Sequence, residues 1–195
     1  MTSRWQRPRD DDVWIMGVLN CTPDSFSDGG SFIDVEKAVA HGLAMQAAGA
    51  AMIDVGGEST RPGAKPVSLT QELERVVPLV QALADADCAV SVDTMKAEVM
   101  RRSISAGAVL VNDVTALRHD PESLDVVAEH GVDVCLMHMQ GDPETMQKNP
   151  EYHGVVDEVM RFFEQRIEAW LQAGIAEIGR ASGRAREERV RGTRA

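Results

Sequence analysis

The stretch Trp14–Gly30, WIMGVLNCTPDSFSDGG, carries the pattern that decides the fold. It begins with a short apolar run that ends at Asn20 and continues as a polar segment rich in Ser, Asp and Gly. A run that is apolar throughout does not alternate between a buried and an exposed face. It therefore predicts a strand buried on both faces, as in a parallel sheet. The polar segment is typical of a loop that follows such a strand.

The same apolar pattern recurs along the chain, and segments with helical periodicity lie between the runs. The predicted strands are 14–20, 51–55, 89–93, 110–114 and 134–139. The predicted helices are 34–48, 70–84, 96–106, 123–130 and 155–173. A glycine follows four of these helices, where a C-terminal glycine is common (Gly49, Gly107, Gly131 and Gly174). Strict alternation of strand and helix predicts an α/β fold with right-handed crossovers.

Two α/β architectures fit this alternation. The apolar runs begin roughly 30 residues apart, and eight such units would need about 240 residues, the usual size of a (β/α)₈ barrel. A doubly wound sheet of five strands fits equally well. In both architectures ligands bind at the carboxyl ends of the strands, so the spacing leaves the choice open but fixes where the site should be.

Composition excludes several classes of protein. The 195 residues are 44% hydrophobic and 26% charged, as in an ordinary globular domain, and a net charge of −11 disfavours a protein that holds nucleic acid through phosphate contacts. Three cysteines without CxxC spacing give no support for a zinc site or a redox pair. No apolar run is long enough to cross a membrane, and the charged start does not resemble a signal peptide. We expect a cytoplasmic protein that does not bind membranes.

The charge is unevenly distributed. Residues 179–195 contain six arginines and two glutamates, a charge of +4, whereas residues 1–178 carry 14 basic and 29 acidic side chains, a charge of −15. The abrupt change predicts that 179–195 is a basic tail outside the fold. A basic amphipathic segment for an acidic partner is the alternative.

Polar residues gather just after the predicted strands. Asp93 and Asn112 lie at the ends of two runs, where ligand binding and a structural hydrogen bond are both compatible with the pattern. Arg61, beside Pro62 on a glycine-flanked loop, is typical of an anion clamp. His138, between two methionines, is better explained as a core histidine than as a ligand. Five strand ends that share this polarity predict an enzyme with a polar pocket for a flat ligand.

Longer motifs then become identifiable. The segments 16–30 (MGVLNCTPDSFSDGG) and 53–63 (IDVGGESTRPG) resemble the two signatures of the dihydropteroate synthase family of pterin-binding enzymes. SVDT at 91–94, VND at 111–113 and LMHMQGDPETMQ at 136–147 match the family in order and spacing. The resemblance implies a (β/α)₈ barrel of the TIM type. It assigns residues 13–178 to the N-terminal part of that barrel, with about five βα units.

The resemblance also implies a reaction in folate biosynthesis. An enzyme of this family condenses 6-hydroxymethyl-7,8-dihydropterin diphosphate with 4-aminobenzoate, releasing diphosphate and forming dihydropteroate. Mg²⁺ is the implied cofactor, small molecules are the implied partners, and the full-length enzyme is expected to form a homodimer. No residue of this chain is assigned a catalytic role with certainty.

Several positions match the family's binding residues. The pterin diphosphate is implied to contact Thr60, Asp93, Asn112 and Met137. The aminobenzoate, and sulfonamides that compete with it, are implied to contact Phe26, Arg61 and Pro62. Asn20 matches the Mg²⁺ ligand, since an amide oxygen is a hard donor and Mg²⁺ takes its other ligands from water and phosphate. The loops 21–30 and 57–66 are implied to close over the site.

Other motifs of the family are missing. A strand ending in Asp-Pro-Gly, a nearby Gly-Lys, a Ser-Arg-Lys strand and an Arg-x-His pair do not occur after residue 178. Five strands of eight leave two open sheet edges, which favour aggregation or swapping. We therefore expect the isolated chain to be poorly soluble or partly folded, with negligible synthase activity. A non-catalytic pterin-binding remnant is the alternative function.

Overall fold

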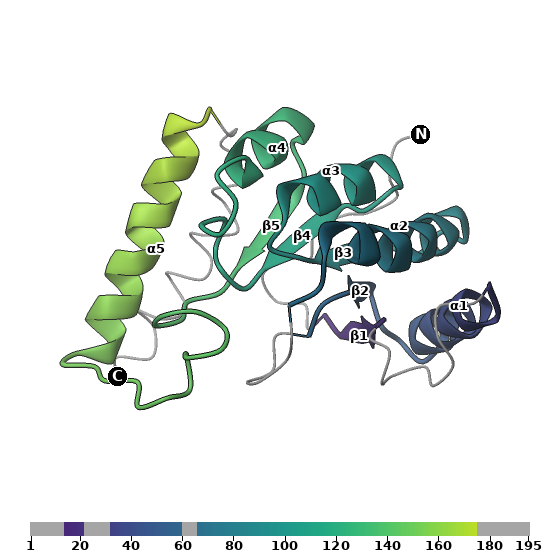
Figure 1. The fold of residues 1–195 in the computed structure, drawn as a ribbon, viewed down its shortest axis with the longest axis horizontal. Coiled ribbons are helices and arrows are strands. Elements are labelled where there is room, and N and C mark those ends of the chain that lie inside the picture. The colour runs from purple at the N-terminus through teal and green to yellow at the C-terminus, as the bar shows by residue number, and fades with distance from the viewer. Residues whose placement is uncertain (1–13, 22–31, 60–65, 175–195) are drawn as a thin grey trace.

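Figure 1 shows the fold of the computed structural model, which describes residues 14–21, 32–59 and 66–174. The strands are β1 (Met16–Asn20), β2 (Met52–Gly56), β3 (Val90–Asp93), β4 (Leu110–Asp113) and β5 (Asp133–Leu136). The helices are α1 (Phe32–Ala47), α2 (Leu69–Asp85), α3 (Ala97–Ser105), α4 (Ser123–His130) and α5 (Val155–Gln172). Strand and helix alternate along the described chain, as the sequence predicts.

The five strands form one parallel sheet in the order β1-β2-β3-β4-β5. Each strand therefore pairs with the strand that precedes it in the chain. A doubly wound sheet would instead reverse its order at a switch point. This progression in one direction is that of a (β/α)₈ barrel, so the α/β class is confirmed, with five successive βα units of the barrel type.

Local signals place the helix ends. Ser68 caps α2 in a capping box, in which the Ser68 hydroxyl accepts a hydrogen bond from the Gln71 backbone N–H. The four glycines predicted to follow helices all have positive φ angles, between 62° and 113°. A glycine adopts these angles without a steric penalty, so the chain can turn from each helix toward the next strand.

The last strand is shorter than predicted. Apolar character continues to Met139, but β5 ends at Leu136. The reason is the ladder: Leu136 pairs with Asp113, which is the last residue of β4, so the next residues have no partner on that strand. Met137 and His138 consequently lie in the loop after β5.

The core lies between the sheet and helices α1 to α4, which follow one another along one face of the sheet (Figure 1). Val55, Val92 and Val111 face it from three neighbouring strands and are fully buried. The prediction that every strand is buried on both faces is wrong for β1, where Val18 is 60% exposed. Because β1 lies at the edge of the described sheet, its residues that point away from the helices have neighbours on one side only.

Replacing a buried leucine should cost the fold more stability than replacing an exposed one. Leu83 on α2 is fully buried and packs against Gly42 of α1. Leu83→Ala should lower the free energy of unfolding by about 3 kcal/mol, from lost apolar burial and the cavity that remains. Leu171→Ala on α5 is the control, because that side chain is 43% exposed. Urea denaturation measures both; equal losses would contradict the assignment of the core.

Two predictions concern residues outside the described part. The basic tail 179–195 is not described, nor is the start of the predicted domain at residue 13. The domain limits 13–178 therefore stay a prediction. Among the described residues no helix is both long and apolar enough to cross a membrane.

Candidate ligand site at the strand ends

The parallel register brings polar residues from different strands into one row. Asn20 of β1 pairs with Gly56 of β2, and Gly56 pairs with Asp93 of β3. Asp93 pairs with Asn112 of β4, which in turn pairs with Cys135 of β5. Residues in register on parallel strands point to the same face of a sheet. The row therefore collects Asn20, Asp93 and Asn112 at the carboxyl end of the sheet.

Gly56 leaves an opening in the middle of this row. A Cβ at Gly56 would lie 3.4 Å from Asn20 Oδ1 and 3.5 Å from Asp93 Oδ2. The amide of Asn20 and the carboxyl of Asp93 thus border the same small space from opposite sides. Asn20 is exposed and Asp93 is half-buried, so both can be reached from the solvent.

Two adjacent glycines should respond differently to alanine. The contacts at Gly56 are ordinary van der Waals distances, so Gly56→Ala should cost less than about 1 kcal/mol of stability. At Gly57 the added Cβ would meet Val76 Cγ2 at 2.6 Å and Glu72 Cγ at 3.0 Å. Gly57→Ala should therefore cost about 2 kcal/mol through overpacking.

Thermal unfolding and ligand titration together test this pair. Gly56→Ala should unfold close to the unsubstituted protein and yet weaken binding of a ligand at the row, because the methyl group fills the opening. Gly57→Ala should show the larger stability loss. A stable Gly56→Ala variant with unchanged ligand affinity would show that the opening is not part of the site.

Asp54 lies two residues before Gly56 on the same face of β2 and is 5% exposed. Asn112 Nδ2 donates a hydrogen bond of 3.0 Å to Asp54 Oδ2. This bond spans β3, because Asn112 and Asp54 belong to the strands on either side of it. Asp54 and Asn112 are therefore linked below the carboxyl group of Asp93.

The pKa of Asp93 is raised to about 7, mainly because burial disfavours the charged carboxylate. The nearby carboxylates of Asp54 and Asp113 raise this pKa further, as do Glu72 and Glu58. Near neutral pH the Asp93 side chain is therefore present in both protonated and charged forms. Such a carboxyl can exchange a proton with a ring nitrogen, and strongly shifted groups in a cleft are typical of functional sites.

An ionic cluster supports the segment that follows β2. The Lys96 ammonium forms ion pairs with both Glu58 and Glu72. The Thr94 hydroxyl donates to Glu72 Oε1 at 2.5 Å, and the Arg75 guanidinium donates to the Gly57 carbonyl at 3.2 Å. Burial alone would lower the pKa of Lys96, but the hydrogen bonds and charges of the two glutamates raise it. The first residues after β2 are thereby held against α2 and the start of α3.

The structure places the predicted site residues as follows. Asn20, Asp93 and Asn112 come together in the row, and Met137 lies half-buried just after β5 at the same end of the sheet. Thr60, Phe26, Arg61 and Pro62 lie outside the described residues. His138 packs edge-on against Phe162, with ring centroids 4.8 Å apart. It is only half-buried and is not part of the core cluster, so its interpretation as a core histidine is not confirmed.

Sequence analysis missed Asp54, Glu72 and Lys96. A carboxylate inside the apolar run at 51–55 is a signal that could have singled out Asp54, because a buried charge needs a partner. Glu72 and Lys96 lie on exposed-looking helical segments in the sequence. Their pairing is visible only once α2 and α3 pack side by side.

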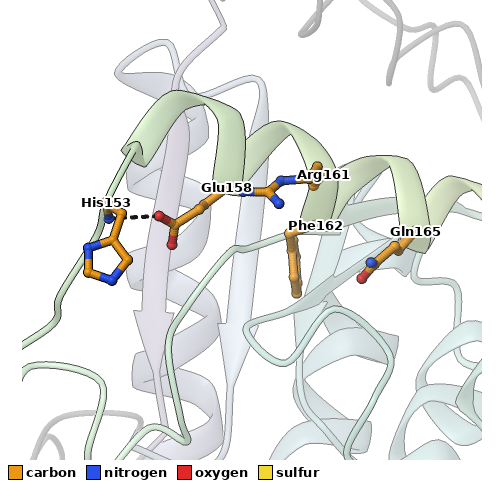
Figure 2. A pocket seen from close by; sticks show the side chains of 5 residues that line it. All are labelled: His153, Glu158, Arg161, Phe162 and Gln165. Carbon is orange, nitrogen blue, oxygen red and sulfur yellow. Dashed lines mark hydrogen bonds between the residues drawn. The ribbon is translucent and has the colours of Figure 1, made fainter.

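A second hollow lies away from the row. Figure 2 shows its lining residues on and just before α5: His153, Glu158, Arg161, Phe162 and Gln165. Its volume is about 440 Å³, and all its side chains come from one helix and the turn before it. Glu158 Oε1 is already engaged there, since it accepts hydrogen bonds from the backbone N–H groups of His153 and Gly154. At this hollow, therefore, polar side chains from several strands do not meet as they do at the row.

The side chains at the row would hold a magnesium ion only if water and phosphate oxygens of a bound ligand supplied the remaining ligands. Among the residues the structure describes, no three His, Cys, Asp or Glu side chains form a metal cage. The exposed amide oxygen of Asn20 is a hard ligand, and Mg²⁺ commonly completes its shell with water and phosphate oxygens. The neighbouring Cys21 suits Mg²⁺ poorly because sulfur is a soft donor. Burial raises the pKa of its thiol to about 12, and Arg75 only partly offsets this.

Comparison with known proteins identifies the family. The profile of the family described as "Pterin binding enzyme" matches residues 16–179. The dihydropteroate synthase of Escherichia coli K12 is 53% identical over 163 residues, which are 83% of this chain and 57% of the relative. The Haemophilus influenzae enzyme is 49% identical over 162 residues, 83% of this chain and 58% of the relative. The chain thus spans somewhat over half the length of these relatives.

Solved structures agree. A Yersinia pestis dihydropteroate synthase in complex with a sulfonamide drug matches with a TM-score of 0.81 and 48% identity, over 90% of this chain and 64% of that one. The Xanthomonas albilineans enzyme with 4-aminobenzoic acid matches with a TM-score of 0.76 and 50% identity, over 86% and 59%. Since the family profile matches well over half of the sequence and the register assembles the row from its motifs, this chain belongs to the pterin-binding enzyme family.

Proposed function

We propose that this chain forms the pterin-binding part of a dihydropteroate synthase. The reaction would join 6-hydroxymethyl-7,8-dihydropterin diphosphate to 4-aminobenzoate and release diphosphate. The observation that carries the proposal is the row itself: Asn20, Asp93 and Asn112 lie in register on three strands around the opening at Gly56. Identities of 48–53% to dihydropteroate synthases support it.

The residues of the row suit the two ends of the pterin substrate. Asp93 and Asn112 offer oxygen acceptors to the N–H and amino groups of a flat ring. Met137, after β5, would contribute an apolar surface for the ring. Asn20 would hold Mg²⁺ against the diphosphate, and the bound ion would neutralise charge on the departing group.

The chemical step is a substitution at the pterin methylene carbon. The bond from this carbon to the diphosphate oxygen breaks, the arylamine nitrogen forms a new bond to the carbon, and the nitrogen then loses a proton. Phe26, Arg61 and Pro62 would surround the aminobenzoate, and Thr60 would lie near the diphosphate. In this proposal Lys96 and Arg75 hold the start of the segment that carries Thr60 and Arg61.

Binding and turnover are separate parts of the proposal. The chain spans 57% of the Escherichia coli synthase and 64% of the Yersinia pestis one, and the Asp-Pro-Gly, Ser-Arg-Lys and Arg-x-His motifs do not occur after residue 178. We infer that the 195-residue chain binds a pterin but does not form dihydropteroate by itself. A pterin-binding protein without catalytic activity is the second candidate function, supported by the same row.

Two assays distinguish these outcomes. The chain is mixed with both substrates and Mg²⁺ and assayed for dihydropteroate, and 6-hydroxymethylpterin is titrated separately by calorimetry. Saturable pterin binding without product is the expected result. Product at a rate proportional to chain concentration would refute the inference about turnover. Absence of pterin binding by folded protein would refute the proposed function.

A further inference from the structure

Asp54 is a charged side chain that the proposed reaction leaves without a task. It lies on β2 within the strand, 5% exposed, and its Oδ1 has no hydrogen-bond partner among the described residues. Its other oxygen accepts the bond from Asn112 Nδ2. Burying a carboxylate is costly, and a carboxylate beside Asp93 adds like-charge repulsion.

We propose that Asp54 is a positioning residue that fixes the amide of Asn112 and thereby selects a ligand edge rich in hydrogen-bond donors. Asp54 Oδ2 accepts the hydrogen bond from Asn112 Nδ2, so the branch of the Asn112 amide that faces Asp54 is the nitrogen. The other branch, the carbonyl oxygen Oδ1, is then left for the ligand. This inference rests on the proposed function and deepens it.

With Asn112 held in this orientation, the site presents hydrogen-bond acceptors to a ligand. Asn112 and Asp93 are neighbours on the same face of the sheet, since these residues pair across β3 and β4. A pterin carries an amino group next to a ring N–H, which are two donors along one edge. A pteridine with an oxo group in place of that amino group, such as lumazine, offers an acceptor there and would face Asn112 Oδ1 with like polarity.

Without Asp54 the orientation of Asn112 is no longer determined. In Asp54→Asn the shape is kept, but the new amide can either accept a hydrogen bond from Asn112 or donate one to it. The Asn112 amide can then rotate and present its nitrogen to an oxo group. Selection between the two pteridines should weaken even though the strand remains well packed.

Titration of pterin and of lumazine into the full chain tests this inference. The unsubstituted chain should prefer pterin, and Asp54→Asn should reduce that preference at least about tenfold, since a site built for specific hydrogen bonds rejects a mismatched analogue strongly. Ser91→Ala is the matched control: Ser91 pairs with Asp54 in the sheet and is fully buried, and its hydroxyl has no hydrogen-bond partner among the described residues. The preference of Ser91→Ala for pterin over lumazine should equal that of the unsubstituted chain.

A second readout separates this inference from the proposed function. NMR exchange of the Asn112 side-chain NH₂ protons in the ligand-free chain should be slow in the unsubstituted protein and in Ser91→Ala. It should be faster in Asp54→Asn. An unchanged pterin preference in Asp54→Asn, or unchanged exchange, would overturn the positioning role. Failure of the folded, unsubstituted chain to bind either pteridine would instead overturn the proposed function.

Discussion

Asp93→Asn is expected to weaken pterin binding by about 100-fold or more and to stabilise the folded chain increasingly as the pH rises from about 4 to about 7. The loss of binding follows because a carboxylate offers two acceptor oxygens to the ring, whereas an amide offers one acceptor and places a donor where the second acceptor stood. The gain in stability follows from the raised pKa of Asp93. Calorimetric titration with 6-hydroxymethylpterin measures the first effect, and urea denaturation across a range of pH measures the second.

The difference between the pKa of Asp93 in the unfolded chain and in the folded chain fixes the direction of the pH effect on stability. The pKa of Asp93 is raised from 3.8 to about 7 by burial and by neighbouring carboxylates. As the pH rises from 3.8 toward 7, the unfolded chain loses this proton before the folded chain does. The carboxyl therefore costs no stability at low pH, and its cost grows until the folded group also ionises, reaching about 4 kcal/mol.

An asparagine does not titrate, so the difference between the two proteins isolates Asp93. Their free energies of unfolding should be closest near pH 4 and should diverge up to about pH 7, with Asp93→Asn the more stable. Parallel curves over this range would contradict the buried, like-charged environment assigned to Asp93. Asp125→Asn, at an exposed position on α4, is the matched control substitution.

Lys96→Met is expected to destabilise the fold by about 4 kcal/mol, because it leaves a buried carboxylate without its counter-ion. The Glu72 side chain is 1% exposed, and Lys96 ion-pairs with it and with Glu58. Adding Glu72→Gln to Lys96→Met should restore part of the loss. A neutral amide costs less to bury and can still accept the hydrogen bond from Thr94.

Arg102→Met provides the comparison on the same helix. Arg102 forms an ion pair of 2.8 Å with Glu98, but its side chain is 64% exposed. Removing an exposed pair should cost less than about 1 kcal/mol. Equal losses of unfolding free energy in Lys96→Met and Arg102→Met would show that the cluster under the segment after β2 is not a buried ionic network.

Much of the fold follows from local sequence signals. Apolar runs and helix-ending glycines predict the strands and helices to within a few residues, and α4 matches its predicted limits. Asn20, Asp93 and Asn112 could be predicted to meet because the carboxyl ends of parallel strands share one edge of a sheet. Choosing between a barrel-type and a doubly wound sheet needed the strand order, which spacing does not encode.

The remainder depends on register and packing. The Asp54–Asn112 hydrogen bond joins residues 58 apart in sequence and requires that β3 lie between β2 and β4. The Lys96–Glu72 ion pair requires α2 and α3 to pack together. The exposure of Val18 depends on what lies beside β1, which no property of an apolar run reveals. Each depends on long-range contacts and not on local propensity.

Binding of a pterin at the strand-end row can be measured residue by residue in one NMR titration. The ¹⁵N-labelled chain is titrated with 6-hydroxymethylpterin, and shifts are mapped onto the backbone amides. Saturable shifts centred on Asn20, Gly56, Asp93 and Asn112 are expected, and they should be absent in Asp93→Asn. Shifts confined to the hollow on α5 between His153 and Gln165, or equal shifts in Asp93→Asn, would contradict it.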